Sequence, residues 1–172
     1  MILDLSPPKL ELVPLLRRAM SEGFAVSALA ARIADDGEYL DALLKPALKS
    51  QLPTGDIIDR VPEKLFWLHD GQTLLGRLNI RVTLNDYTAR QGGHLGYEVH
   101  PLHVNKGYGT LLLRHGLQFL NENASLPRAL VTIDDDNAPS IRVVEKCGAV
   151  LQDVIPHPAY PDRLHRRYWI DT

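Results

Sequence analysis

A glycine turn, Lys106-Gly107-Tyr108-Gly109, is the clearest place in this sequence for a bound anion. Gly107 and Gly109 allow the backbone to bend sharply and let a ligand approach it closely. Leucines recur at helical spacing directly after the turn, which predicts a helix from about Thr110. The first amides of a helix have no intrahelical partner and carry about half a positive charge. We therefore expect this turn to hold a phosphate or the diphosphate of a coenzyme.

Two other groups of polar residues suggest metal ligands by composition alone. His100 and His103 flank Pro101 in a predicted loop, without a third ligand beside them. The acidic segment 134–137 lacks the glycine and the terminal glutamate of a calcium-binding EF-hand loop. The sequence therefore predicts no metal site.

The elements that lead into the glycine turn show strand patterns. Segments 64–68 and 73–84 are predicted strands, joined by the hairpin turn His69-Asp70-Gly71-Gln72. Within the second of them apolar and polar residues alternate, so one face is expected to be buried and the other polar. Residues 85–93 are expected to form a turn and residues 94–99 the next strand. Three consecutive antiparallel strands therefore precede the turn.

The pattern after the predicted helix indicates a buried strand and a second helix. Residues 129–133 form a continuous apolar run, which is typical of a strand buried on both faces. Asn137 is a favourable N-cap and Gly148 a favourable terminator for the helix between them. Two final strands are predicted at 150–155 and 167–170, with a long proline-containing loop between them.

The beginning of the chain carries less chemical information. The patterns predict a strand within 3–8, a helix within 9–20 that starts near Pro14, and two short helices within 24–48. A loop around 53–56 follows. We expect this part to cover the core and to shape the mouth of a substrate site.

Length and composition favour a single domain over 1–172, with a mainly helical part at 1–60 and a sheet core at 61–172. The order of the elements predicts an α+β fold and not a repeated βαβ winding. A net charge of −2 argues against nucleic-acid binding. No apolar run approaches about 18 residues, so no membrane span is expected. The single cysteine, Cys147, fits a reducing cytoplasm.

Two of these elements together resemble the signature of the GNAT superfamily of N-acetyltransferases. The family's turn, (Q/R)-x-x-G-x-(G/A), matches residues 104–109, with Val104 in place of the usual glutamine or arginine. The second element is an asparagine after a strand, followed by a helix that ends in E-K-x-G. It matches Asn137, Ser140 and Glu145-Lys146-Cys147-Gly148. The sequence is similar to a bacterial subgroup of predicted GNAT enzymes.

The resemblance implies a central mixed, mostly antiparallel sheet flanked by helices. It also implies an acetyl-CoA-dependent N-acetyltransferase whose acceptor is a primary amine of a small molecule, an amino-acid derivative or a peptide. The strand at 94–99 is expected to splay from the strand at 129–133, and family members often form homodimers. The residues that the resemblance places against acetyl-CoA are Tyr97, Val99, Val104, Asn105, Lys106, Gly107, Tyr108, Gly109, Thr110, Asn137 and Ser140.

The implied reaction requires a group that takes a proton from the acceptor. A lysine-like amine has a pKa of ~10.4, so its neutral form costs about 4.6 kcal/mol at pH 7. A general base, or a water chain to one, offsets part of that cost. Glu98 and His94 are the candidates on the strand at 94–99, and Asp134 and Asp136 follow the next strand. A polar residue satisfied at the sheet surface is the alternative for Glu98 and His94.

The implied reaction also requires protonation of the departing thiolate. Many GNAT enzymes carry a tyrosine acid where this chain has Val144. Tyr168 is therefore a candidate acid, Tyr108 is a second, and water is the alternative to both. The absence of the family tyrosine also motivates an alternative function, a non-catalytic acyl-CoA-binding sensor or docking module.

The acceptor itself is expected on the polar face of the predicted sheet. Asn79 and Arg81 could contact it, and Arg81 could form a forked pair with a carboxylate. An exposed polar sheet surface is the alternative for both residues. A nucleotide-binding enzyme is disfavoured because GYGTLL lacks the third glycine of G-x-G-x-x-G and the chain has no P-loop.

Overall fold

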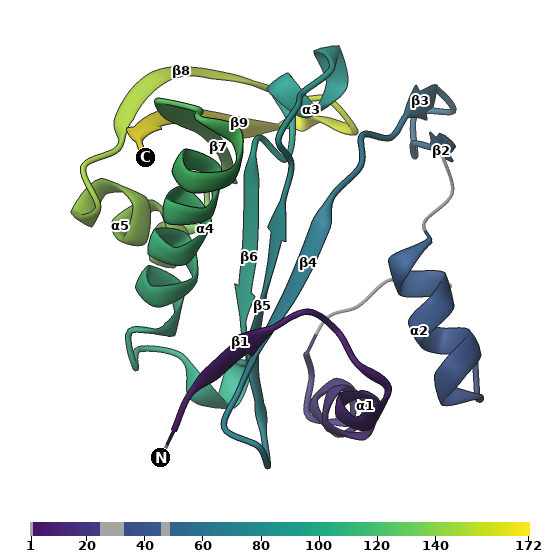
Figure 1. Ribbon diagram of the computed structural model, residues 1–172. Coiled ribbons are helices and arrows are strands. Elements are labelled where there is room, and N and C mark those ends of the chain that lie inside the picture. The colour runs from purple at the N-terminus through teal and green to yellow at the C-terminus, as the bar shows by residue number, and fades with distance from the viewer. Residues whose placement is uncertain (1, 25–32, 46–48) are drawn as a thin grey trace.

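Two antiparallel sheets form the centre of the molecule (Figure 1). The computed structural model describes residues 2–24, 33–45 and 49–172. The larger sheet has the order β1-β4-β5-β6, with β1 at Asp4–Ser6, β4 at Lys64–His69, β5 at Leu74–Ile80 and β6 at Leu95–Val99. The smaller sheet has the order β7-β9-β8, with β7 at Arg128–Asp134, β9 at Tyr160–Asp171 and β8 at Val150–His157. β6 and β7 are therefore edge strands of different sheets.

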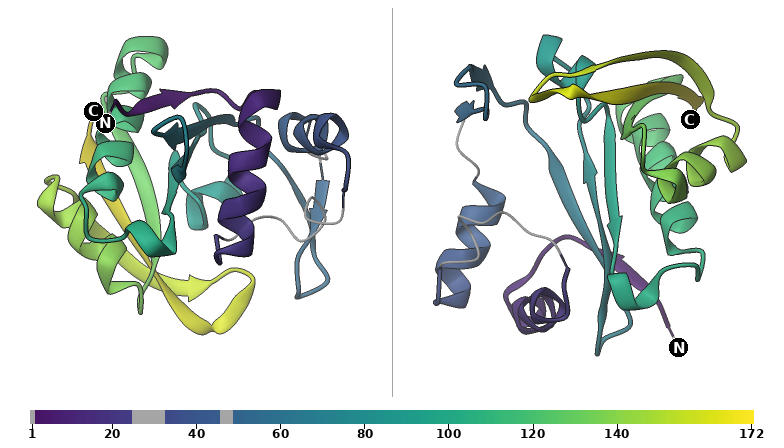
Figure 2. Two further views of the ribbon diagram at one scale, coloured as in Figure 1. Left: turned by 90° about the horizontal axis from the view of Figure 1, so that it is seen from below. Right: turned by 180° about the vertical axis from the view of Figure 1, so that it is seen from behind.

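Helices cover both sides of the larger sheet (Figures 1 and 2). On one side lie α4 (Tyr108–Ala124) and α5 (Ala138–Lys146), and on the other lie α1 (Val13–Ser21) and α2 (Asp36–Leu44). Short 3-10 helices precede α1 (η1, Leu10–Leu12) and the glycine turn (η3, Pro101–His103). The prediction of an α+β fold with a mostly antiparallel sheet between helices is confirmed.

Strands β4 and β5 contribute side chains to two apolar cores, one on each side of the sheet. The core toward α4 and α5 includes Leu78, Ile80, Leu95, Leu112, Leu113, Val131, Ile133 and Val144. The core toward α1 and α2 includes Val13, Leu16, Tyr39, Trp67 and Leu74. Because β1 pairs with β4, the first sixty residues contribute a strand to the larger sheet as well as helices. The sheet is thereby fixed from both sides.

The hairpin between β4 and β5 forms as predicted. Asp70 Oδ1 accepts hydrogen bonds from the amides of Gln72 and Thr73 at 2.9 and 2.7 Å, and Gly71 has a φ of +86°. β5 ends at Ile80, four residues before the predicted end of the strand. The expected turn at 85–93 instead contains α3 (Asp86–Arg90), which Asn85 initiates through a capping box with Thr88.

The predicted long loop before the last strand is wrong. β8 extends to His157 and β9 begins at Tyr160, so the two strands form a tight hairpin. Pro156 is tolerated because β8 is an edge strand. Pro161 lies in the part of β9 that extends beyond its pairing with β7. Each proline therefore leaves the central ladder intact.

Two further differences concern the front of the chain. The expected loop around 53–56 is the turn of a small hairpin, formed by β2 (Lys49–Gln51) and β3 (Ile57–Asp59). Of the two helices predicted within 24–48, α2 is present with Asp35 as its N-cap, and the rest of that prediction falls largely on 25–32, outside the described residues. Across 2–24, 33–45 and 49–172, no helix has the length and apolarity that a membrane crossing requires.

Candidate active site

The glycine turn leads into the N-terminus of α4, whose first amides are not capped by a side chain. Asn105 and Gly107 have φ values of +61° and +85°, a conformation that glycine adopts easily. Gly107 is the N-cap of α4, and no side chain hydrogen-bonds to cap this end of the helix. The first amides of α4 are therefore available to a ligand, and the helix dipole favours a negative charge there.

A cavity of about 550 Å³ opens beside this helix end, between β6, the glycine turn and α5. It brings together ten of the eleven residues predicted to contact the coenzyme. These ten are Tyr97, Val99, Val104, Asn105, Gly107, Tyr108, Gly109, Thr110, Asn137 and Ser140. The exception is Lys106, whose Nζ lies 3.2 Å from His103 Nδ1 at the surface.

Helix α5 forms the opposite wall of this cavity. Asn137 Oδ1 accepts a hydrogen bond from the Ser140 amide at 3.2 Å, so it caps α5 as predicted while it lines the cavity. Arg142 and Lys146 also line the cavity, and neither was predicted. Their spacing of four residues on a helix places them on one face, which was the available sequence signal. They add two positive charges opposite the helix end.

Tyr97 bridges the two walls. Its hydroxyl donates to the Ser140 carbonyl oxygen at 3.4 Å, which connects β6 to α5. Burial raises the pKa of Tyr97 to about 12, only partly offset by its bond to Ser140. The hydroxyl therefore remains protonated at neutral pH and acts as a hydrogen-bond donor.

Hydrogen bonds join the two sheets at the residue that precedes β6. The His94 amide donates to the Leu130 carbonyl oxygen at 2.7 Å, and the Leu130 amide donates to His94 Nδ1 at 2.9 Å. A side chain thus replaces the backbone acceptor of a second rung. Beyond this contact, which we call the His94 junction, the described residues of β6 and β7 form no ladder. The predicted splay of these strands is present.

A second cavity of about 260 Å³ lies between the splayed strands and shares Tyr97, Asn137 and Ser140 with the first. The first is called the coenzyme cavity and the second the inner cavity below. The remaining walls of the inner cavity are Gln91, Gly92, Leu95, Gly96, Val131, Thr132, Ile133, Asp134 and His165.

Comparison with known proteins identifies this arrangement. The family model of the GNAT acetyltransferase domain matches residues 60–150, which is more than half of the chain. The chain belongs to the GNAT acetyltransferase family. It is therefore an acetyl-CoA-dependent N-acetyltransferase, as the sequence predicted.

Solved structures show the same GNAT fold. Spermidine N-acetyltransferase from Vibrio cholerae is 15% identical with a TM-score of 0.63, over 98% of this chain and 93% of that chain. RimJ from Mycobacterium smegmatis, in complex with CoA-disulfide, is 18% identical with a TM-score of 0.70, over 99% and 82% of the two chains. A comparison with curated protein sequences found no match.

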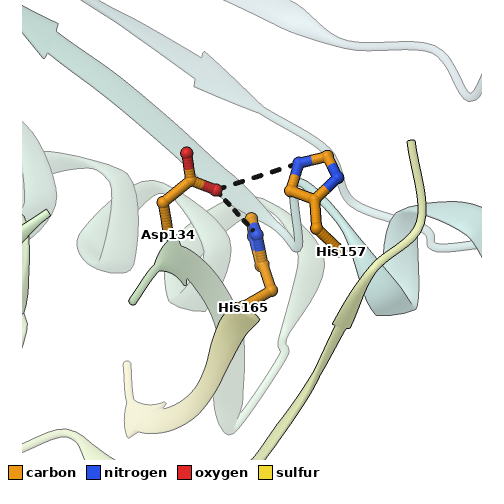
Figure 3. A group of neighbouring side chains, drawn as sticks. All are labelled: Asp134, His157 and His165. Carbon is orange, nitrogen blue, oxygen red and sulfur yellow. Dashed lines mark ion pairs between the residues drawn. The ribbon is translucent and has the colours of Figure 1, made fainter. Parts of the chain in front are cut away.

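The acetyltransferase also contains a cluster of charged and polar side chains that the sequence did not reveal (Figure 3). Asp134 Oδ1 lies 2.9 Å from His165 Nδ1 and 3.8 Å from His157 Nε2. Both histidines are buried, at 5% and 3% exposure. One ligand-type atom from each residue lies within 4.8 Å of the other two. The sequence analysis found no such cluster because its three members come from three different strands, β7, β8 and β9.

The predicted acid–base residues are dispersed. Glu98 lines the coenzyme cavity, and its Oε2 lies 2.8 Å from Arg77 Nη2. His94 lines neither cavity among the described residues, its Nδ1 accepts the Leu130 amide, and burial lowers its pKa. Tyr168 is buried in the core, donates to Glu145 Oε1 at 3.1 Å, and has a pKa that burial raises.

The predicted acceptor residues lie on the sheet face opposite α4, but Arg81 is already engaged. Its Nη2 lies 2.8 Å from Glu63 Oε2, and its Nη1 donates to the carbonyl oxygens of Gly92 and Gly93 at 3.5 and 3.4 Å. Arg81 therefore holds the loop before β6 in place. Asn79 is half-buried, and its register partner on β6 is Gly96, which lines the inner cavity.

Proposed function

We propose that this enzyme binds the diphosphate of acetyl-CoA at residues 104–110, with the pantetheine arm along Tyr97–Val99, and receives the acceptor amine in the inner cavity. The observation that carries the proposal is that the two cavities are neighbours and share Tyr97, Asn137 and Ser140 as lining residues. The coenzyme cavity offers open helix amides, and the inner cavity offers side chains that can handle protons.

The chemistry of the coenzyme cavity suits a diphosphate. The unfilled amides at the start of α4 donate hydrogen bonds, and the dipole of this 17-residue helix favours an anion. Arg142 and Lys146 face the same space and supply charge-assisted hydrogen bonds. Bound acetyl-CoA supplies an activated thioester, and the residues of this chain hold it and admit the amine.

The acceptor is a primary amine of a small molecule, an amino-acid derivative or a peptide. The carboxylate of Asp134 lines the inner cavity, with its Oδ1 near His165 Nδ1 and its Oδ2 paired with Arg163 Nη2 at 2.9 Å. Because Arg81 is paired with Glu63, we propose no role for it in binding an acceptor carboxylate. Asn79 remains a proposed contact to the acceptor.

Titration calorimetry with CoA tests the coenzyme site. Arg142→Ala and Lys146→Ala should each weaken CoA binding roughly tenfold, because a hydrogen bond to a charged group contributes about 1.5–3 kcal/mol. Arg128→Ala is the control, since Arg128 is a half-exposed cation on β7 that pairs with Asp171. Equal effects of all three substitutions, or no CoA binding by the unchanged protein at millimolar concentration, would contradict the proposal.

Turnover distinguishes the enzyme from a sensor. A panel of primary amines is screened for release of free thiol from acetyl-CoA. Steady release with at least one amine is the expected result. Tight CoA binding without release across the panel would instead support an acyl-CoA-binding module.

We also propose that residues 1–172 fold as one domain and that the enzyme acts as a homodimer in the cytoplasm. The edge strand β8 exposes Val150, Leu151 and Val154, which supports pairing of two copies. Sedimentation of the purified protein tests this, and a monomer at micromolar concentration would contradict it.

A further inference from the structure

We propose that His165, oriented by Asp134, is the general base that takes a proton from the acceptor amine. The inference rests on the proposed function and assigns a catalytic residue to the inner cavity. It replaces the earlier candidates Glu98 and His94.

The register of the smaller sheet places the two residues together. Asp134 on β7 and His165 on β9 are directly opposite each other in the antiparallel ladder. Side chains of such a pair lie on the same face. Both line the inner cavity, and His165 Nδ1 lies 2.9 Å from Asp134 Oδ1 (Figure 3).

This contact leaves one nitrogen of His165 for chemistry. Both ring nitrogens of His165 are buried and lack a hydrogen bond of good geometry among the described residues, and Nδ1 makes only the 2.9 Å ion-pair contact with Asp134 Oδ1. With the proton on Nδ1, the nitrogen nearer the carboxylate, Nε2 carries the lone pair of the neutral imidazole. A buried polar atom without a partner is rare in folded proteins. An amine bound in the inner cavity would supply the missing partner.

His157 keeps this cluster from acting as a metal site. Its Nδ1 accepts hydrogen bonds from the amides of Ala159 and Tyr160 at 3.0 and 3.1 Å, so the ring proton lies on Nε2. Nε2 is the atom that faces Asp134, and Gln91 Nε2 lies 2.9 Å from it. With the ring proton on His157 Nε2, the Gln91 amide has to turn its oxygen toward the ring to accept that proton. A protonated Nε2 donates hydrogen bonds and cannot coordinate a cation. The group therefore handles protons.

The charges around His165 keep it neutral until it acts. Burial lowers its pKa, Asp134 opposes this by raising it, and His157 on β8 and Arg163 on β9 lower it further. The net direction is downward, so the imidazole is uncharged at neutral pH and available to accept a proton. Once protonated, it faces the carboxylate of Asp134, which stabilises the positive charge.

Glu98 is less suited to this role. Its Oε2 is 2.8 Å from the Arg77 guanidinium, and its side chain is 29% exposed. One carboxylate oxygen of Glu98 is therefore already engaged by a cation. His165 has no such competing cation in direct contact with Nε2 among the described residues.

The proton balance of the transfer is complete with His165 as base. The acceptor ammonium loses one proton to His165 Nε2, and its nitrogen lone pair then forms the bond to the acetyl carbon. The carbon–sulfur bond breaks, and its electron pair leaves with sulfur. The second nitrogen proton passes to that sulfur, and His165 returns its own proton to solvent. The products are the acetamide, the free thiol and one released proton.

The test compares His165→Gln with the same substitution at another buried histidine that pairs with an aspartate. His69→Gln is the control, because His69 is also buried, its Nε2 lies 3.3 Å from Asp4 Oδ2, and it is not among the residues that line either cavity. We expect His165→Gln to lower kcat about 100-fold, in the range typical of general base catalysis, with little change in KM for acetyl-CoA. Asp134→Asn should lower kcat about tenfold. His69→Gln should leave kcat within a factor of about three of the original.

Two further measurements separate a proton-transfer role from a structural one. The acid limb of kcat in the unchanged enzyme should disappear in His165→Gln. In NMR spectra of the free protein, one imidazole that titrates below the ordinary histidine range should be missing in the same variant. Calorimetry should show unchanged CoA binding.

Three outcomes would overturn the inference. The first is a kcat of His165→Gln within a factor of about three of the original, and the second is a retained acid limb. The third is activity lost in a chelator and restored by zinc, which would make the cluster a metal site. If His165→Gln does not fold, Asp134→Asn carries the same comparison through the position of the acid limb. Failure of the unchanged protein to bind CoA would overturn the proposed function instead.

Discussion

The coenzyme cavity and the inner cavity are neighbours that are built in different ways. The coenzyme cavity uses mainly two continuous segments, 104–110 and 137–146, together with β6. Much of its chemistry comes from backbone amides, so the side chains can vary, as Val104 does. The inner cavity instead depends on particular side chains from β6, β7, β9 and the end of α3. Substitutions should therefore affect the two cavities in different ways.

The two sheets are hydrogen-bonded to each other at the His94 junction and form no ladder beyond it among the described residues. Gly93→Ala is the most severe test of this junction. A Cβ at this position would lie 2.3 Å from the Leu130 carbonyl oxygen, and Gly93 has a φ of +58°. We expect a loss of about 3 kcal/mol of unfolding free energy, from overpacking and the left-handed backbone together. Thermal unfolding should shift downward by about 10 °C.

Gly71→Ala is the matched control for this prediction. Gly71 also has a positive φ, but a Cβ there would meet no atom within 4 Å. It should lose only about 1 kcal/mol. Equal losses in the two variants would show that the close approach of the sheets at the junction is not fixed.

His94 at the junction and His165 in the inner cavity should respond differently to pH. Burial lowers the pKa of His94 in the folded protein. Between that pKa and the unfolded value of about 6.5, the unfolded chain therefore binds more protons than the folded chain. Stability should therefore be full above about pH 6.5 and fall as the pH drops through this window. His94→Gln keeps an acceptor for the Leu130 amide without a titrating ring, so it should flatten this dependence and lose about 1 kcal/mol at neutral pH.

Unfolding curves at several pH values, alongside kcat in the same buffers, check this prediction. His94→Gln should change the pH dependence of stability and leave the acid limb of kcat in place. His165→Gln should remove that limb. A variant at position 94 that also removed the limb would break the distinction between the two histidines.

The smallest effect is expected where the two cavities share a wall. Tyr97→Phe removes the hydrogen bond to Ser140 and should lose about 1 kcal/mol of stability, with KM for acetyl-CoA raised about fivefold at most. Because the pKa of Tyr97 is about 12, its hydroxyl exchanges no proton at neutral pH, and the acid limb of kcat should not move. A displaced limb in Tyr97→Phe would show that the shared wall takes part in proton transfer.

The coenzyme cavity was largely predictable because its information is local. The glycine turn, the N-cap Asn137 and the helix terminator Gly148 each act over a few neighbouring residues, and all three occur where the sequence placed them. The family model, which matches residues 60–150, then confirmed the predicted GNAT family. Arg142 and Lys146 were missed although their helical spacing was visible.

The inner cavity was not predictable because it depends on register. Asp134 pairs with His165 only because β9 begins well before residue 167, at Tyr160. The sequence analysis had predicted a loop at these positions. Prolines favour loops in general, and only the edge position of β8 makes Pro156 compatible with a strand. His157 and His165 therefore had no predicted element to place them.

The Leu130 amide on β7 donates to the His94 imidazole. A further backbone hydrogen bond between β6 and β7 could use this amide only if the imidazole moved away. At the narrow end of the opening, the separation of the two sheets is thus set by His94, a residue that lines neither cavity among the described parts of the chain. The width of the inner cavity, which lies between the two sheets, therefore depends on a ring outside its lining.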